Sequence, residues 1–233
     1  MKNFAIIIPI FNEIDSIFNL LDEIKKEFEG ELPELIVVDD GSTDDFSKKK
    51  IELKKNSPKI FHHKKNLGKC RAMLTGIKNA KKNNICIIDG DGQNPPYEAK
   101  KLMNFWMNIN NQEKKFALVC GNRIKRQDSM SKKISSKIAN KIRKIMLDDD
   151  CNDTACALKV FSKEDYLKLE YFKNMHRFLP ALFKINSGKI FNVPVDDRKR
   201  TKGISKYSFH NRFWIGILDL INVWLMVLKR RKK

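Results

Sequence analysis

The chain has 233 residues, 42% of them hydrophobic, which excludes wholesale disorder and allows one α/β domain with a short appendage. Its 47 Lys and Arg against 28 Asp and Glu give a formal net charge of +19, which favours anionic partners: nucleic acid, a membrane surface or phosphorylated small molecules. The five cysteines are scattered without a Cys-x-x-Cys pair, which disfavours a zinc site and indicates a reducing, cytoplasmic compartment.

The first half of the chain alternates short apolar runs with segments of helical spacing. We expect strands at Phe4–Ile8, Leu35–Val38, Lys59–His62, Ile85–Ile88 and Phe116–Cys120, and helices at Ile14–Phe28 and Gly68–Ala80. This order predicts a mostly parallel sheet with helices on both faces. Ligands of such sheets bind at the carboxyl ends of the strands.

Polar clusters follow these strands directly, at Asn12-Glu13, Asp39-Asp40, Asp89–Gln93 and Asn122-Arg123. This repeated placement is the strongest topological feature of the sequence. Since the carboxyl ends of parallel strands meet at one edge of a sheet, the clusters predict one shared ligand site.

The loop Asp89–Gln93 carries the clearest chemistry. Asp89 and Asp91 stand at positions i and i+2 after an apolar strand, so both carboxylates can converge on Mg²⁺ or Mn²⁺ and link it to a diphosphate. Gly90 and Gly92 permit close approach of a ligand, and Gln93 adds an oxygen. The alternative is a plain turn, because Asp and Gly are common turn residues.

Asp39-Asp40-Gly41-Ser42 follows another apolar strand, where a carboxylate can accept a hydrogen bond from a base N–H or a ribose hydroxyl. The alternative is helix capping by Ser42 or Asp44, and both roles can hold together. Phe11, after the first strand, could stack on a nucleobase or pack in the core, and Glu13 is similarly open.

Four segments occur in a characteristic order: Pro9–Glu13, Val37–Asp44, Asn66–Lys69 and Asp89–Pro96. In this order they resemble the family 2 inverting glycosyltransferases, and among these the dolichol-phosphate mannose synthase-like polyprenyl-phosphate glycosyltransferases. Later segments extend the resemblance over nearly the whole chain. These are Gly121–Arg123, Asp153–Phe161, Val193–Val195, Arg198–Arg200 and Gly203–Tyr207.

The resemblance implies a GT-A fold, an α/β fold of the kind expected above, and assigns roles to residues at matching positions. Donor contacts fall on Pro9, Phe11, Glu13, Val38, Asp40, Asp89, Gly90, Asp91, Arg123, Arg200 and Lys206. Metal contacts, to Mg²⁺ or Mn²⁺, fall on Asp89, Asp91 and Gln93. The implied catalytic residues are Asp91, Arg123 and Asp153.

The chain departs from the family at three places. Phe11 stands where Tyr is usual, which removes a hydroxyl contact but keeps ring stacking. Gly90 and Gly92 stand where Ala or Leu-type residues are usual, which predicts a more flexible loop. Ala155 and Ala157 stand where Gly is common, and this makes the local backbone differ from the family pattern.

The resemblance implies transfer of a sugar, with inversion, from GDP-mannose or a UDP-sugar to a polyprenyl phosphate. Because that acceptor is already an anionic nucleophile, it hardly needs a general base; Asp153 could orient it, act as a base or cap local structure. A second interpretation is a family 2 transferase with a soluble glycan or lipopolysaccharide acceptor. A nucleic-acid-binding module is disfavoured, because the acidic clusters repel phosphate without a metal and no such motif is present.

A lipid acceptor predicts attachment to a membrane. Ser131–Leu147 combines a stripe of isoleucines with many Lys and Arg, and Phe213–Leu228 is almost wholly apolar, with Trp214 and Trp224 near its ends. The second segment is shorter than the roughly 20 residues that span a bilayer. We therefore expect peripheral attachment to an anionic, cytoplasmic membrane face. Core packing or an oligomer interface is the alternative for both segments.

These expectations divide the chain into a GT-A domain over residues 1–210 and a basic, amphipathic, membrane-associating segment over residues 211–233. The expected partners are the nucleotide-sugar donor, the polyprenyl phosphate acceptor and the anionic membrane surface. A second copy of the chain or a membrane protein could be a further partner.

Overall fold

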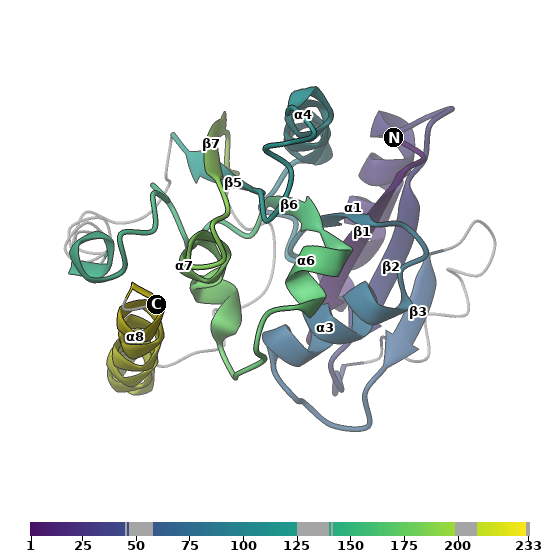
Figure 1. The fold of residues 1–233 in the computed structure, drawn as a ribbon. Coiled ribbons are helices and arrows are strands. Elements are labelled where there is room, and N and C mark those ends of the chain that lie inside the picture. The colour runs from purple at the N-terminus through teal and green to yellow at the C-terminus, as the bar shows by residue number, and fades with distance from the viewer. Residues whose placement is uncertain (45, 47–57, 125–139, 141, 199–208, 232–233) are drawn as a thin grey trace.

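The computed structural model describes residues 1–44, 46, 58–124, 140, 142–198 and 209–231. At its centre lies a seven-stranded sheet in the order β3-β2-β1-β4-β6-β5-β7 (Figure 1). The strands are β1 (Phe4–Ile10), β2 (Glu34–Asp39), β3 (Lys59–His62), β4 (Asn84–Ile87), β5 (Leu118–Arg123), β6 (Lys159–Ser162) and β7 (Ile190–Val195).

The central strands are apolar on both faces because helices cover the sheet from both sides. All seven residues of β1 are buried, and β1 pairs in parallel with β2 and β4, so that Ile7 lies opposite Ile36 and Ile87. β-Branched side chains suit such doubly covered strands. The parallel pairing brings the carboxyl ends of β1, β2 and β4 to one edge, as the sequence predicts.

β6 is the exception to the parallel arrangement. It runs antiparallel to both β4 and β5, whereas β5 pairs in parallel with β7. The sheet is therefore mostly parallel, which confirms the predicted fold class. β5 begins two residues later than expected, because Phe116 adopts a positive φ of 52° that interrupts the extended chain before Leu118.

Two layers of helices enclose the sheet. On one face, α1 (Ile14–Glu27) and α4 (Pro96–Asn108) pack through residues such as Leu20 and Leu102. On the other face lie α3 (Lys69–Asn79), α6 (Lys163–Leu167) and α7 (Leu179–Lys184), together with the short 3₁₀ helix η2 (Met175–Arg177). This three-layer arrangement buries a continuous core on each side of the sheet.

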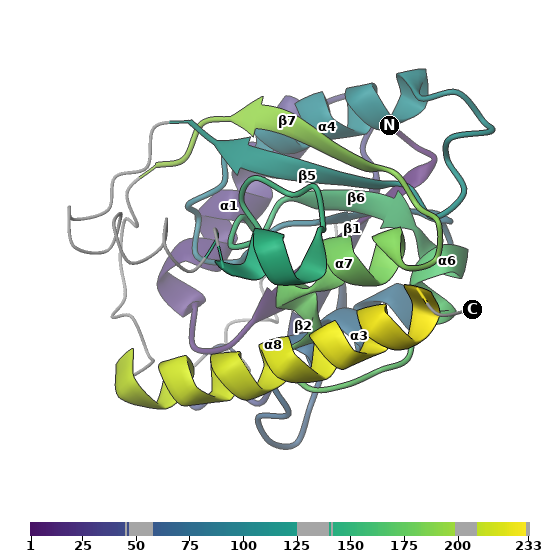
Figure 2. The same cartoon turned by 60° about the vertical axis from the view of Figure 1, so that its left-hand side comes forward.

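The C-terminal helix α8 (Phe209–Arg231) lies outside these layers and packs against α7 (Figure 2). Val223 and Val227 are buried in a small cluster with Leu147, Phe178 and Ala181. The core-packing alternative thus holds for one side of the helix, while another side presents apolar residues to solvent. No helix in the described part of the chain is long and apolar enough to cross a bilayer.

The predicted basic helix over Ser131–Leu147 lies largely outside the described residues. Of this segment the structure describes residue 140 and residues 142–147, which are helical. Leu147 is buried, whereas Ile142 is 48% and Ile145 74% exposed. Beneath them Arg143 and Asp149 form a buried ion pair of 3.3 Å, in which burial of the carboxyl raises the pKa of Asp149.

Candidate active site

The polar segments that follow β1 and β2 are joined to each other by hydrogen bonds. The backbone N–H of Asn12 donates to Ser42 Oγ over 2.8 Å, and Asn12 Oδ1 accepts from the N–H of Thr43 over 2.7 Å. Asp44 Oδ2 accepts from the N–H of Ile14 at the start of α1, 3.2 Å away. Asp44 Oδ1 also accepts from the N–H of Phe46 over 3.2 Å, which is the local capping bond that one sequence alternative proposes, so this carboxylate serves both segments.

Asp39 and Asp40, at the end of β2, are both buried and hydrogen-bonded within the protein. Asp39 accepts from the N–H of Ser42 over 2.9 Å and contacts His62 Nδ1 over 2.6 Å. The histidine is not a residue that the sequence motifs single out. The parallel register of β2 and β3 places it opposite Asp39, so a paired-strand prediction carries the signal that identifies it.

Asp40 anchors the loop that leads into α3. Its Oδ1 accepts from the N–H of Leu67 over 3.0 Å, and its Oδ2 accepts from the N–H of Gly68 over 2.7 Å. His63 Nδ1 lies 2.7 Å from the same carboxylate, and its Nε2 lies 2.9 Å from Thr75 Oγ1. The predicted donor residue thus also shapes the loop at the edge of the site.

The 39–44 and 63–68 loops touch at Gly41. This glycine has a φ of 74°, and a Cβ atom there would lie 2.5 Å from the carbonyl carbon of Lys65. Only glycine combines that backbone angle with such a close approach. The sequence Asp-Gly-Ser therefore serves the packing of two loops as well as the turn itself.

The predicted metal loop follows β4 and is held by hydrogen bonds from two residues, Ser16 and Arg198. Ser16 Oγ donates to the carbonyl of Gly90 over 2.9 Å, Arg198 Nε donates to the carbonyl of Gly92, and the N–H of Arg198 donates to the carbonyl of Gln93. Asp91 Oδ1 accepts from the N–H of Gln93 over 3.0 Å. These hydrogen bonds hold the backbone at both glycines. The contacts therefore do not show the greater loop flexibility that the sequence predicts.

Gly90 packs against the end of β1. A Cβ atom at this position would lie 2.4 Å from Ile10 Cγ2 and 3.5 Å from the carbonyl oxygen of Pro9. The absence of a side chain thus lets the metal loop lie directly on the first strand. A side chain at this position would require Ile10 or the loop to shift.

The chemistry of this loop fits a hard divalent cation. Asp89 and Asp91 offer carboxylate oxygens, Gln93 offers an amide oxygen, and Asp89 already holds a cation, because Lys69 Nζ lies 2.5 Å from its Oδ1. Within the described ranges, no three His, Cys, Asp and Glu side chains gather as a metal cluster. Mg²⁺ commonly binds through only one or two carboxylates and takes its other ligands from water and substrate phosphates.

A second charged cluster joins β5 to the segment before β6. Arg123 Nε and Nη2 donate to the two oxygens of Asp153 over 2.7 and 3.1 Å, and its Nη1 lies 3.5 Å from Asp197 Oδ2. Burial opposes the charge of Arg123, but the hydrogen bonds and the charge of Asp153 outweigh it and raise the pKa of the guanidinium. Two carboxylates therefore already pair with Arg123, the arginine to which the sequence resemblance assigns phosphate binding.

The other predicted donor residues divide into buried and accessible groups. Pro9 and Val38 are buried, so that only their backbone can face a ligand, whereas Phe11 and Glu13 are partly exposed. Arg200 and Lys206 lie outside the described residues. The structure thus brings the residues after β1, β2 and β4 together at one edge. It adds His62, His63 and Asp197 to those found from the sequence, and it pairs the motif residue Lys69 with Asp89.

Acidic and amide-bearing loops gather at the carboxyl edge of a mostly parallel sheet, which is the edge where α/β proteins of this class bind their ligands. The chain belongs to the family described as glycosyl transferase family 2, whose model matches residues 5–169. It is 30% identical over 228 residues to a dodecaprenyl-phosphate galacturonate synthase of Rhizobium johnstonii. That match covers 94% of this chain and 65% of the relative, so the chain spans about two thirds of the relative's length.

Solved structures confirm the GT-A fold. A glucosyl-3-phosphoglycerate synthase of Mycobacterium tuberculosis, in complex with Mn²⁺, UDP and glucosyl-3-phosphoglycerate, superposes with a TM-score of 0.71 at 16% identity. The match covers 97% of this chain and 80% of that one. The same enzyme with Mg²⁺ and UDP gives a TM-score of 0.71 at 15% identity, over 97% and 79% of the two chains.

Proposed function

We propose that this chain transfers a sugar, with inversion, from a nucleotide sugar such as GDP-mannose or a UDP-sugar to a polyprenyl phosphate. The observation that carries the proposal is the tethered Asp89–Gln93 loop, which lies at the carboxyl edge of the sheet beside the loops after β1 and β2. The family supports glycosyl transfer, and the name of the Rhizobium relative supports a polyprenyl phosphate as acceptor.

In this proposal the loops after β1 and β2 bind the nucleotide. Phe11 stacks on the base, Glu13 and Asp40 contact the nucleoside, and the backbone of Pro9 and Val38 lines the floor. Asp89, Asp91 and Gln93 would hold Mg²⁺ or Mn²⁺ at the carboxyl end of β4, where Gly90 lets this loop lie directly on β1. Such an ion, when bound, stabilises the negative charge that develops on the leaving diphosphate.

Asp153 acts in this proposal by orienting Arg123. Both of its carboxylate oxygens are engaged by that guanidinium, and a polyprenyl phosphate is already an anionic nucleophile near neutral pH that hardly needs a general base. Arg123 then presents a fixed donor to a phosphate at the carboxyl edge. Arg200 and Lys206 remain proposed phosphate ligands on the strength of the sequence.

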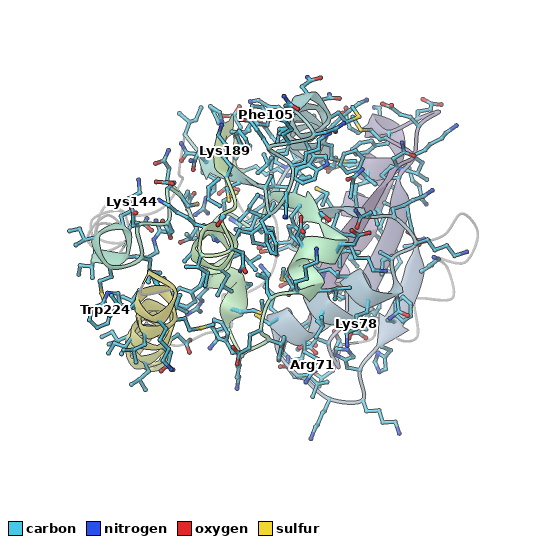
Figure 3. All side chains as sticks on the ribbon, viewed as in Figure 1. Arg71, Lys78, Phe105, Lys144, Lys189 and Trp224 are labelled. Carbon is cyan, nitrogen blue, oxygen red and sulfur yellow. The ribbon has the colours of Figure 1, made fainter. Side chains whose placement is uncertain are left out.

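The proposed acceptor requires a membrane, and α8 offers a surface for one. Leu218, Ile221 and Leu225 are 63%, 40% and 45% exposed and share one side of the helix, opposite the buried Val223 and Val227. We assign residues 211–233, with the basic end of the chain, to peripheral attachment of a catalytic domain over residues 1–210. Figure 3 shows Trp224 of α8 and Lys144 on the same side of the molecule. We propose that the chain attaches to the cytoplasmic face of the membrane.

The test is an extraction assay. The full chain is incubated with a polyprenyl phosphate, Mn²⁺ or Mg²⁺, and labelled sugar nucleotides, including GDP-mannose and several UDP-sugars. The proposal predicts label in the organic phase with one of these donors, and none when EDTA is added. Label that enters only water-soluble product would overturn the lipid acceptor and favour a soluble glycan acceptor.

A further inference from the structure

Lys69 is a charged motif residue to which the proposed function assigns no role. It is the first residue of α3, and its Nζ lies 2.5 Å from Oδ1 of Asp89, which follows β4. Each of the two side chains is 30% exposed, so the ion pair is open to solvent on one side. The lysine ammonium thus occupies a carboxylate oxygen that the proposed function assigns to a divalent cation.

The backbone on both sides of Lys69 is fixed. Gly68 donates its N–H to Asp40 Oδ2 over 2.7 Å, which anchors the residue before the lysine. Cys70, the residue after the lysine, is anchored by His176. Its Sγ atom accepts from the backbone N–H of His176 over 3.3 Å and lies 3.0 Å from Nδ1 of the same histidine. The ammonium can therefore leave Asp89 only by rotation of its own side chain, and it stays within reach of the site.

Two cations cannot share one carboxylate oxygen without repelling each other. A solvent-exposed ammonium–carboxylate pair contributes only about 0.2–1 kcal/mol, so a divalent cation can displace it. The displaced ammonium then lies beside a divalent charge, and this position becomes favourable when an anion is also present. The diphosphate of a nucleotide sugar supplies that anion, and the amino end of α3 favours negative charge at the same place.

We propose that Lys69 is a placeholder cation: it neutralises Asp89 in the free protein, leaves when Mg²⁺ or Mn²⁺ binds there, and then pairs with the donor diphosphate. This inference rests on the proposed metal and donor site. Its consequence is that Lys69 weakens metal binding to the free protein but strengthens nucleotide binding to the metal-loaded protein. A residue with a purely structural role would change both affinities in the same direction.

The experiment measures two affinities on the full chain and on Lys69→Met, with Lys78→Met as the matched control. Lys78 lies in the last turn of the same helix, is exposed and carries the same charge (Figure 3). Mn²⁺ binding is followed by electron paramagnetic resonance of the free ion, without nucleotide and with UDP or GDP. Nucleoside diphosphate binding is followed by calorimetry at saturating Mn²⁺ and in EDTA.

Lys69→Met is expected to bind Mn²⁺ about 3- to 5-fold more tightly than the wild type without nucleotide, which corresponds to the worth of an exposed ion pair. It should bind the diphosphate at least about 10-fold more weakly in Mn²⁺, and within about 2-fold of the wild type in EDTA. Lys78→Met should match the wild type in all three measurements. Unchanged or weaker Mn²⁺ binding by Lys69→Met would overturn the placeholder role.

Failure of the proposed function gives a different result. If none of the three proteins binds Mn²⁺, with or without a diphosphate, the metal site itself is wrong and the inference falls with it. If Mn²⁺ binds to all three equally and the diphosphate binds to all three equally, the metal site stands and only the role of Lys69 is overturned.

Discussion

The two halves of the site use their polar side chains in different ways. In the loops after β1 and β2, Asn12, Asp40 and Asp44 accept hydrogen bonds from backbone N–H groups and so fix the course of the chain. Around β5, Arg123 pairs with side-chain charges, those of Asp153 and Asp197. The first half is a scaffold that holds the backbone of two loops in place, whereas the second half is a network of charges that an incoming phosphate would rebalance.

The largest effect is expected in the metal loop that joins these halves. Asp91→Asn removes a carboxylate charge while keeping the side-chain shape, and we expect sugar transfer to fall about 100- to 1000-fold. Circular dichroism should show an unchanged fold. Asp22→Asn, which alters an exposed carboxylate 3.7 Å from Lys25 Nζ, is the matched control and should keep full activity. Full activity of Asp91→Asn would remove the metal loop from the mechanism.

The charge network should respond to loss of one partner by loss of stability. Asp153→Asn leaves the Arg123 guanidinium, whose side chain is 14% exposed, facing a neutral amide, and we expect the free energy of unfolding to fall by about 2–3 kcal/mol. Urea denaturation measures this change. Ser42→Ala in the scaffold half should cost less, about 1 kcal/mol, because it removes one hydrogen bond from the backbone N–H of Asn12 and no charge. Equal losses would contradict the distinction between the halves.

The contact between His176 and Cys70 of α3 should give the stability a dependence on pH. Burial, together with the nearby charges of Lys69, Arg177 and Lys159, lowers the pKa of His176 in the folded chain. Below about pH 6.5 the unfolded chain therefore takes up a proton that the folded chain refuses, and stability falls as the pH falls. The contribution of this group has a slope of up to about 1.4 kcal/mol per pH unit.

The variant His176→Gln tests this assignment. It should flatten the fall in stability between pH 6.5 and 5 relative to the wild type, as measured by urea denaturation at several pH values. An identical slope in the two proteins would mean that other groups cause the pH dependence.

The smallest expected effect concerns the membrane. Lys229 is exposed near the end of α8, and its replacement in Lys229→Gln should weaken binding to vesicles with anionic lipid by about fivefold, or about 1 kcal/mol. Vesicle flotation measures the affinity, with Lys78→Gln on α3 as the control. Equal binding to anionic and neutral vesicles by the wild type would count against this membrane surface.

The position of the scaffold half can be predicted from the sequence, because its contacts join loops that follow neighbouring strands. Short apolar runs identify β1, β2 and β4. The polar segments Asp39-Asp40 and Asp89–Gln93 come at the ends of β2 and β4 in the sequence. The predicted ends of these strands lie within two residues of the observed ones. Periodicity and turn chemistry are local properties, and they determine this region.

The remaining contacts depend on long-range packing, which local patterns do not encode. Cys70 and His176 are 106 residues apart, and only the docking of η2 on α3 brings them together. The antiparallel direction of β6 is likewise set by its neighbours, since four buried residues carry no signal of direction. For the same reason Asp197 is found as a partner of Arg123 only once β5 and β7 are paired.

The most direct test of the account is a crystal structure of the full chain with Mn²⁺ and UDP or GDP, with the metal located by anomalous scattering. We predict an anomalous peak bonded to Asp91 and Asp89 and to the diphosphate, at the carboxyl end of β4. A diphosphate bound at this edge without metal, or a peak whose ligands exclude both aspartates, would contradict the central claim.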